Sequence, residues 1–252
     1  MPKTSAILVL KDIRLAPQDR HDAETAPINL EITPGESVVV TGPSGSGKSS
    51  LLFIAAGFQR PHPGAVMLFG SETYAARVTD SFPIRRRIGF VFQEPVFVSH
   101  LSCLENIELP LYYDGKLDED AIREKAAQTL ALAGLEKCPE SMPDDHPPLV
   151  RRKLALARAW MRDPEIVFYD EPAKLLDALA QKASYRVIRD YHEHRKKTGR
   201  PASAFISCND PRGLLDWADH FLALSDGTLT FSADKTTIQT QRLRIERDFS
   251  AQ

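Results

Sequence analysis

A strand-like run, a glycine-rich loop and a helix-like run follow one another near the start of this chain, and together they constrain its fold more than any other feature. Val38 to Thr41 favours a β-strand, and Leu51 to Ala56 favours a helix. The loop between them has the spacing Gly-x-x-x-x-Gly-Lys-Ser, from Gly42 to Ser49. Glycines let the backbone turn tightly and approach a ligand, and a helix N-terminus favours negative charge. The stretch therefore predicts a phosphate-binding P-loop.

The side chains of this loop divide by chemistry. Lys48 is expected to reach the β- and γ-phosphates of a nucleoside triphosphate, and the Ser49 hydroxyl is expected to hold Mg²⁺. The N–H groups of the loop and of the first helical turn face the same anion. The predicted phosphate-contacting residues are Gly42, Ser44, Gly45, Ser46, Gly47, Lys48, Ser49 and Ser50.

A second chemical motif follows the apolar run Ile166 to Tyr169, which has the length of a buried strand. Asp170 and Glu171 come at its end, where open α/β sheets place their ligands. One carboxylate there would bind Mg²⁺, and its neighbour would orient and deprotonate an attacking water. An acidic pair after an apolar strand can also mark a plain helix N-terminus, but the P-loop upstream favours the magnesium site.

Apolar alternation and clustering predict the other elements. The expected strands are Ala6 to Leu15, Pro27 to Ile32, Ala65 to Phe69, Ile88 to Phe92, Ala204 to Ser207, and a hairpin of Phe221 to Leu224 with Thr228 to Thr230 around Asp226-Gly227. Helical patterns cover Leu101 to Leu135, a segment that begins after Pro147-Pro148 and continues to Trp160, and a segment in which Leu179, Ala183, Val187 and Tyr191 recur at helical spacing. The polar end, Ser232 to Gln252, is compatible with a helix or an arm. Arg85 to Arg87 is compatible with a phosphate or lipid site, although such a run is more often a solvated edge.

Composition limits the partners. The 32 Lys and Arg residues and 34 Asp and Glu residues are interspersed and give a net charge of -2, so nucleic acid is not a predicted partner. Cys103, Cys138 and Cys208 lie far apart without C-x-x-C spacing, as expected of reduced thiols in the cytoplasm. No apolar run has the length of a membrane span, so any membrane work is expected of another chain.

The order of these motifs resembles that of the ATP-binding cassette (ABC) ATPases, from about Leu8 to Gly227. Segments similar to the family's Q-loop, post-signature helix, Walker B motif and end of the D-loop are Arg85 to Gln93, Lys153 to Trp160, Phe168 to Pro172 and Leu176-Asp177. The resemblance implies an α/β fold: a P-loop NTPase (RecA-like) core sheet with an N-terminal antiparallel β subdomain and a helical signature subdomain. It implies an ATPase domain over residues 1–230, with the helical subdomain inserted at about 95–162, and a C-terminal tail over 231–252.

The same resemblance implies the cofactors ATP and Mg²⁺. It adds Gln93 to the nucleotide-binding residues. The implied magnesium ligands are Ser49, Gln93 and Asp170, and the implied catalytic carboxylate is that of Glu171. The implied assembly is a head-to-tail dimer with a second ABC ATPase subunit, identical or different, in which each ATP is capped by the other subunit's signature motif. A transmembrane permease subunit is the other implied partner. The resemblance also implies that the chain lies in the cytoplasm, on the inner face of the cell membrane.

The family's signature, Leu-Ser-Gly-Gly-Gln, falls on His146-Pro147-Pro148-Leu149-Val150. Prolines supply neither a hydroxyl nor an N–H to the γ-phosphate of a facing subunit. Losing one such donor typically costs about 2.7–4 kcal/mol in the transition state. Arg151 or Arg152 is a candidate replacement clamp. The alternative is an alignment slipped through this proline-rich loop, although the chain contains no Ser-Gly-Gly.

Three further positions depart from the family. Its switch histidine falls on Asn209, a degenerate catalytic position that can donate one hydrogen bond to the γ-phosphate but carries no proton or charge. The D-loop has Ala173-Lys174-Leu175 in place of small polar residues. Leu15 to Glu24 contains no Tyr, Phe or Trp to stack on adenine, and His21 is its only ring.

Two functions remain open on these residues. The first is an ATP-binding subunit of an ABC transporter, with slow or negligible hydrolysis as a homodimer and any hydrolysis at a hybrid site with another subunit's intact signature. Leu104 to Leu111 resembles the corresponding segment in the lipoprotein-releasing, macrolide-export and lipid-trafficking branches. The alternative is a regulatory or scaffold subunit that binds ATP to stabilise an assembly. A DNA-repair or chromosome-organising protein is disfavoured because no heptad run separates the motifs, and a small-molecule kinase or GTPase would not explain Gln93.

Overall fold

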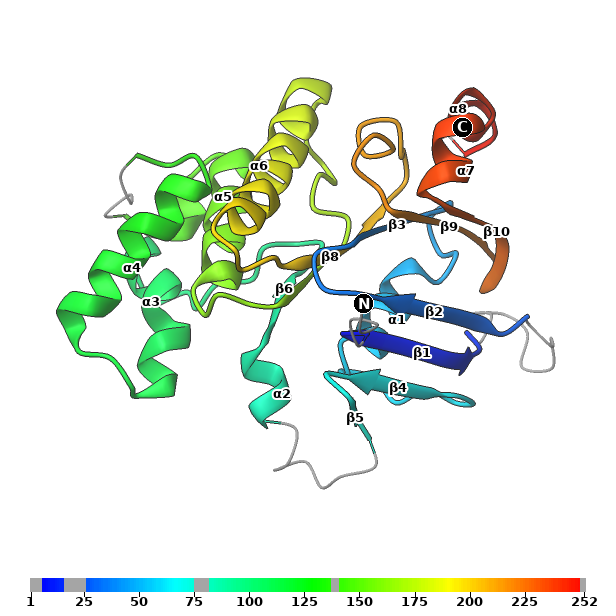
Figure 1. Cartoon of the computed structure of the whole chain (residues 1–252). Coiled ribbons are helices and arrows are strands. Elements are labelled where there is room, and N and C mark those ends of the chain that lie inside the picture. The colour runs from blue at the N-terminus through cyan, green and yellow to red at the C-terminus, as the bar shows by residue number, and fades with distance from the viewer. Residues whose placement is uncertain (1–5, 16–25, 75–81, 137–140, 250–252) are drawn as a thin grey trace.

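A six-stranded sheet, here called the core sheet, organises the structure (Figure 1). The computed structural model describes residues 6–15, 26–74, 82–136 and 141–249 of the chain. The strand order is β10-β9-β3-β8-β7-β6. The bounds are β3 (Ser37–Thr41), β6 (Ile88–Val91), β7 (Ile166–Tyr169), β8 (Ser203–Cys208), β9 (His220–Ser225) and β10 (Thr228–Asp234). All neighbours are parallel except β9 and β10, which form the predicted antiparallel hairpin.

Both faces of the core sheet are buried. Successive side chains of a strand point to opposite faces, and β3 shows the result: Val38 and Val40 belong to one hydrophobic cluster and Val39 to the other. The first cluster also contains α1 (Lys48–Ala55) and the N-terminal strands, whereas the second contains the later helices. This is why β3 is apolar throughout rather than alternating.

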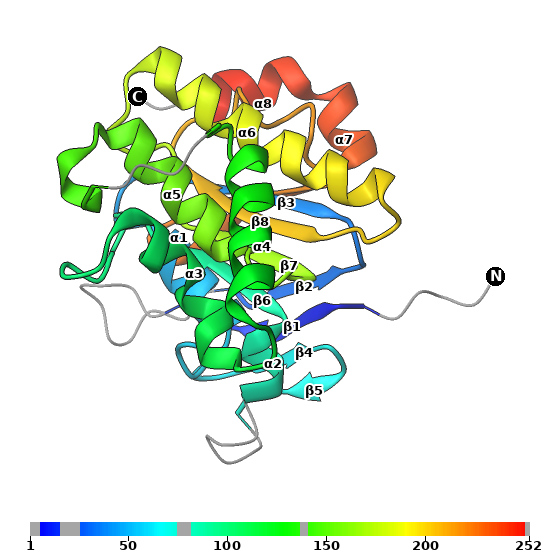
Figure 2. The ribbon, with the colours of Figure 1, turned by 90° about the vertical axis from the view of Figure 1, so that its left-hand side faces the viewer.

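The N-terminal strands form a separate antiparallel sheet, as predicted. Its order is β2-β1-β4-β5, with β1 (Leu8–Ile13), β2 (Ile28–Ile32), β4 (Ala65–Leu68) and β5 (Ser71–Glu72). Alternate side chains of β2 are buried and exposed, because only one of its faces packs on the core. In Figure 2 this sheet and helix α6 lie on opposite sides of the core strands.

The predicted helical run from Leu101 to Leu135 consists of two helices, α3 (Cys103–Asp114) and α4 (Glu119–Leu132). Gly115, at φ 61°, ends α3 in the left-handed conformation that glycine adopts most readily. The Asp118 carboxylate then accepts a hydrogen bond from the Ala121 N–H and starts α4. A short helix, α2 (Phe82–Arg86), and a 3-10 turn, Pro143–Asp145, precede β6 and α5 (Pro148–Trp160) respectively.

Helix α6 (Ala178–Lys197) is present as predicted, and its buried face includes polar side chains. Leu179 is 79% exposed, and the buried side chains are Ser184, Ile188, Tyr191, His192 and Arg195. Polar side chains can replace apolar ones there because each has a partner. The Ser184 hydroxyl, for example, donates to the Pro172 carbonyl at 3.2 Å.

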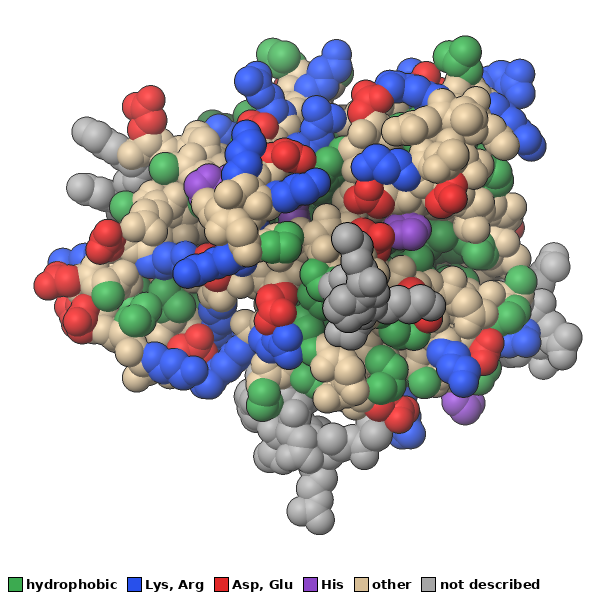
Figure 3. All heavy atoms as spheres, in the orientation of Figure 1, with side chains coloured by type: hydrophobic (Ala, Val, Ile, Leu, Met, Phe, Trp, Pro, Cys, Tyr) green, Lys and Arg blue, Asp and Glu red, His purple; other side chains and the backbone are tan. Residues whose placement is uncertain are grey.

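The chain after the hairpin is ordered against the core sheet. Strand β10 continues to Asp234, and α7 (Lys235–Thr240) and α8 (Arg242–Phe249) follow. Ile238 and Ile245 are buried in the same cluster as the core-sheet strands. Among the described residues, the structure has no helix both long and apolar enough to cross a membrane. Lys and Arg side chains alternate with Asp and Glu over the face seen in Figure 3.

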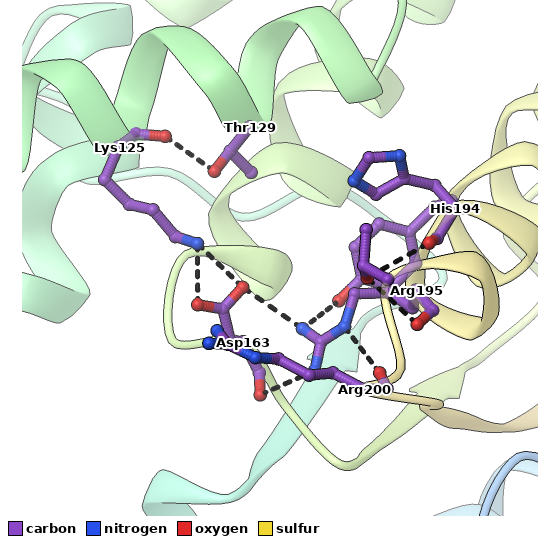
Figure 4. A network of polar contacts seen from close by, with 8 residues as sticks. Lys125, Thr129, Asp163, His194, Arg195 and Arg200 are labelled. Carbon is purple, nitrogen blue, oxygen red and sulfur yellow. Dashed lines mark hydrogen bonds and ion pairs between the residues drawn. The ribbon is translucent and has the colours of Figure 1, made fainter.

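A polar network joins α4 to the end of α6 (Figure 4). The Asp163 carboxylate lies between the Lys125 ammonium, at 2.7 and 2.6 Å, and the Arg195 guanidinium, at 3.1 Å. Arg195 also donates to the Arg200 carbonyl at 2.9 Å and is itself buried. Charged side chains thus attach α4 to α6 and to the segment before β7, in addition to the apolar packing of helices α3 to α5, here called the helical layer.

Under α6, a buried hydrogen-bonded row crosses from α5 to β8. The Trp160 indole donates to the Tyr169 hydroxyl at 2.9 Å, and Tyr169 lies 2.9 Å from Nε2 of His192. Nδ1 of His192 lies 2.8 Å from the Ala202 carbonyl, which can only accept, so Nδ1 carries the proton and Nε2 accepts from Tyr169. The row is therefore complete only with a neutral imidazole. Burial lowers the pKa of His192 to about 4, and the Ala202 hydrogen bond opposes this shift.

We expect His192 to make the fold acid-sensitive. The unfolded chain takes up a proton near the usual pKa of 6.5 but the folded chain only near 4, so stability is lost as pH falls through this window, by up to about 3 kcal/mol. His192→Gln should flatten this slope while lowering stability at pH 7, because the hydrogen bonds become poorer. Urea unfolding at pH 7 and pH 5 measures both effects. His100→Gln, at an exposed histidine, is the control, and an unchanged slope in His192→Gln would contradict the assignment.

Candidate functional site

The loop between β3 and α1 has the conformation that its glycines permit. Gly42, Gly45 and Gly47 have φ of 153°, 82° and 96°. A Cβ on Gly42 would lie 2.2 Å from the Leu224 carbonyl oxygen, so no other residue fits there without displacement. The loop is also pinned from the hairpin side, since the Gly227 N–H donates to the Ser46 carbonyl at 3.1 Å.

Lys48 lies at the centre of the site. Its side chain is 3% exposed, and its ammonium donates to the Gly42 and Pro43 carbonyls at 2.8 and 2.9 Å. The same ammonium forms an ion pair with Glu171 Oε1 at 3.2 Å. Lys48 is therefore held between the P-loop and the end of β7.

Asp170 joins the P-loop helix to two neighbouring strands. Its Oδ1 accepts hydrogen bonds from the hydroxyls of Ser49 and Ser207, at 2.9 and 2.8 Å. Its N–H donates to the Val91 carbonyl at 2.9 Å, beside the end of β6. Burial raises the pKa of Asp170 above its usual range, and the two hydroxyl bonds only partly oppose this shift.

Glu171 follows in a strained turn. Its φ is 39°, a region that non-glycine residues rarely adopt and that clusters at functional sites. Its N–H donates to the Ser207 hydroxyl at 2.8 Å. Its two carboxylate oxygens face different ammonium groups, Lys48 at 3.2 Å and Lys174 at 3.1 Å.

Gln93 comes two residues after β6 and is half-buried. Its carbonyl and that of Phe92 accept hydrogen bonds from the Arg152 guanidinium, at 2.7 and 2.9 Å. Burial lowers the pKa of Arg152 to about 10, and the charge of Asp170 is the main effect that opposes this shift. Arg152 thus fixes the backbone at Gln93. Arg151 pairs instead with Asp144 at 3.0 Å, so neither arginine lies free at the start of α5.

The remaining predicted residues lie at the edges of the site. Ser44 and Gly45 are exposed at the tip of the loop, and Ser50 is half-buried in α1. Asn209 is exposed after β8, where its carbonyl accepts from the Thr41 hydroxyl at 3.2 Å. The segment predicted to lack an adenine-stacking ring, Leu15 to Glu24, lies outside the described residues except for Leu15. Cys138 also lies outside the described residues.

Two residues of the site escaped the sequence predictions. Ser207, which bonds to both Asp170 and the Glu171 N–H, lies in the strand next to β7. The sequence places Ser207 at the end of a strand, which is compatible with a site residue. Only the pairing of β7 with β8 shows that its hydroxyl reaches Asp170 and Glu171. The sequence predicts Arg152 only as a candidate phosphate clamp, because its bonds to the carbonyls of Phe92 and Gln93 depend on how α5 packs.

The residues fit a magnesium nucleotide. A hydroxyl and a buried carboxylate, Ser49 and Asp170, are the oxygen ligands that Mg²⁺ prefers. Ser46 Oγ is buried and has no hydrogen-bond partner among the described residues, although it lies in the loop that a phosphate would approach. Lys48 supplies the positive charge for the phosphates. The fold and this site define a P-loop nucleoside triphosphatase domain.

The comparisons with known proteins place the domain in one family. Residues 25–174 match the ABC transporter family. The chain is 31% identical over 234 residues to the chloroplastic protein TRIGALACTOSYLDIACYLGLYCEROL 3 of Arabidopsis thaliana, over 88% of this chain and 68% of that protein. It is 30% identical to the lipoprotein-releasing system ATP-binding protein LolD 1 of Chlorobium chlorochromatii, over 79% and 81% of the two chains. The chain belongs to the ABC transporter family, as an ATPase domain.

Two further matches agree with this. The sulfate/thiosulfate import ATP-binding protein CysA of Bacillus cereus is 33% identical over 80% of this chain, which spans 55% of that protein, so the chain covers about half of this relative's length. The ATP-binding cassette MJ0796, solved as a dimer bound to ADP and Pi, has a TM-score of 0.78 at 26% identity, over 90% of this chain and 98% of that one. The predicted α/β P-loop fold is thereby confirmed.

We expect Gly42→Ala to lower the free energy of unfolding by about 2–4 kcal/mol, since it adds backbone strain to a clash with the Leu224 carbonyl. Gly70→Ala is the matched control: Gly70 also has a positive φ, 79°, but apart from its chain neighbours no atom of the described residues lies within 4 Å of an added Cβ. Gly70→Ala should therefore cost only about 1 kcal/mol. Urea unfolding compares the two variants. Equal losses would show that the contact with Leu224 does not constrain the loop.

Proposed function

We propose that this chain is the ATP-binding subunit of an ABC transporter, which binds MgATP on its P-loop and acts on a separate transmembrane permease. The observation that carries the proposal is the convergence of Lys48, Ser49, Asp170 and Glu171, contributed by two segments 121 residues apart. The chain would work as a dimer with a second ATPase subunit, on the cytoplasmic face of the membrane. The solved dimer of MJ0796 with ADP and Pi supports such an arrangement by analogy.

Each residue would have a distinct role. Lys48 and the loop N–H groups would bind the phosphates, while Ser49, Asp170 and Gln93 would hold Mg²⁺, which supplies charge neutralisation at the phosphates. Glu171 would orient and deprotonate the attacking water. Asn209 would donate one uncharged hydrogen bond to the γ-phosphate.

The residues at the start of α5 support the proposal that a homodimer of this chain hydrolyses ATP slowly. Pro147 is its N-cap and Pro148 its first residue, and no side-chain hydrogen bond from the described part of the chain caps the helix. The His146 ring is engaged by the Ser141 hydroxyl at 2.7 Å. This helix end therefore offers a facing γ-phosphate fewer donors than a Ser-Gly-Gly segment would. Hydrolysis would then occur at a hybrid site, formed by this P-loop and the intact signature of another subunit.

We place the cargo among lipids or lipoproteins. The segment Leu104 to Leu111 supports this proposal, as do two relatives, the lipoprotein-releasing system protein LolD 1 and TRIGALACTOSYLDIACYLGLYCEROL 3. The sulfate/thiosulfate import protein CysA represents the competing substrate class. Transport assays with the cognate permease, using a lipid or sulfate as cargo, distinguish the two classes.

Lys48→Met should weaken MgATP binding by more than roughly tenfold, because it removes a buried cation that the phosphates require. Isothermal titration calorimetry on the purified chain measures this loss. Lys116→Met, at an exposed lysine on the helical layer, should bind as the wild type does. Equal affinity of Lys48→Met and wild type would exclude the P-loop as the ATP site.

The purified chain alone should hydrolyse ATP roughly a hundred- to a thousandfold more slowly than a complex with a subunit that has an intact signature. Glu171→Gln should abolish the activity of that complex. Rapid hydrolysis by the isolated chain would contradict the role given to the start of α5. If Glu171→Gln instead leaves transport unchanged while ATP still binds, the alternative function holds, a scaffold subunit that uses ATP to stabilise an assembly.

A further inference from the structure

Glu171 carries an ammonium group at each of its carboxylate oxygens. Lys48 lies 3.2 Å from Oε1, and Lys174 lies 3.1 Å from Oε2. The Lys174 contact lacks hydrogen-bond geometry, so it is a Coulombic pair. The Glu171 side chain is 7% exposed, and a carboxylate so buried needs at least one opposite charge nearby.

The two lysines differ in what holds them. Lys48 is fixed by carbonyls of the P-loop and belongs to the phosphate site. Lys174 belongs to the same turn as Glu171: its N–H donates to the Glu171 carbonyl at 2.9 Å, and its side chain is 31% exposed. Lys174 therefore belongs to the turn that holds Glu171 rather than to the phosphate site.

When a triphosphate binds, Lys48 would contact the phosphates, whereas Lys174 would stay beside Glu171. The ammonium of Lys48 cannot serve the Glu171 carboxylate and a triphosphate equally well, because the triphosphate carries the larger charge. Once Lys48 turns to the phosphates, Glu171 would remain buried beside a polyanion of the same sign. The loop would then lose an attractive pair and gain a repulsive one.

We infer that Lys174 is a positioning residue that keeps Glu171 countercharged when Lys48 turns to the phosphates of ATP. This inference rests on the proposed function, since it requires a triphosphate on the P-loop. If Lys174 has this role, removing its charge weakens ATP binding only when residue 171 is itself charged.

A double-mutant cycle tests the inference on the full chain. The probe is MgAMP-PNP, whose imido bridge resists hydrolysis, and the measurement is its Kd by isothermal titration calorimetry. Lys174→Met should weaken binding roughly five- to tenfold, the range of a partly screened ion pair. Lys174→Arg keeps the charge and should bind within about twofold of wild type. In the Glu171→Gln background, Lys174→Met should have no further effect, because the charge that needs compensation is gone.

Lys182→Met, which removes one charge from an exposed position on α6, should leave the affinity unchanged. Equal losses from Lys174→Met in both backgrounds would overturn the inference, since Lys174 would then act on the nucleotide directly or through the fold. So would a Lys174→Met affinity equal to that of the wild type. These two results refute the inference alone, whereas absence of MgAMP-PNP binding by the wild-type chain refutes the proposed function as well.

Discussion

The site depends on the mutual compensation of charges buried at the carboxyl ends of β3 and β7. Lys48, Asp170 and Glu171 are 3%, 2% and 6% exposed, and a buried charge without a partner costs several kcal/mol. The ion pair of Lys48 with Glu171 and the hydroxyl bonds to Asp170 supply those partners. The same contacts hold the P-loop against β7, so the groups that would bind the nucleotide also hold each other in place.

A second connection runs from α5 to the Q-loop. The buried Arg152 guanidinium donates to the carbonyls of Phe92 and Gln93. The backbone position of Gln93 therefore depends on how α5 packs. Charged side chains play a similar part at Asp163, where α4 and α6 meet. The helical layer and the nucleotide site are thus joined through specific polar contacts, which tolerate less variation than apolar packing does.

Local signals explain which predictions succeeded. The P-loop and the Asp170-Glu171 pair are read from spacing next to apolar runs, and the Asp226-Gly227 hairpin from turn chemistry. The spacing of apolar residues predicts α6 but not the burial of Ser184, His192 and Arg195, which depends on hydrogen bonds to other segments. The periodicity of apolar residues predicts which apolar side chains are buried. It does not predict the burial of a polar side chain whose hydrogen-bond partner lies in another segment.

By itself, the sequence determined the order of the motifs, the glycine-rich loop between a strand and a helix, and the apolar strand that ends at Asp170 and Glu171. These depend on neighbours in the chain, where backbone conformation and side-chain spacing are set locally. Only the tertiary structure decided that Ser207 holds Asp170, that Arg152 holds the Q-loop backbone, and that Glu171 lies between Lys48 and Lys174. The physical reason is that each of these contacts balances a buried charge or polar group, and that balance exists only once the strands are packed side by side.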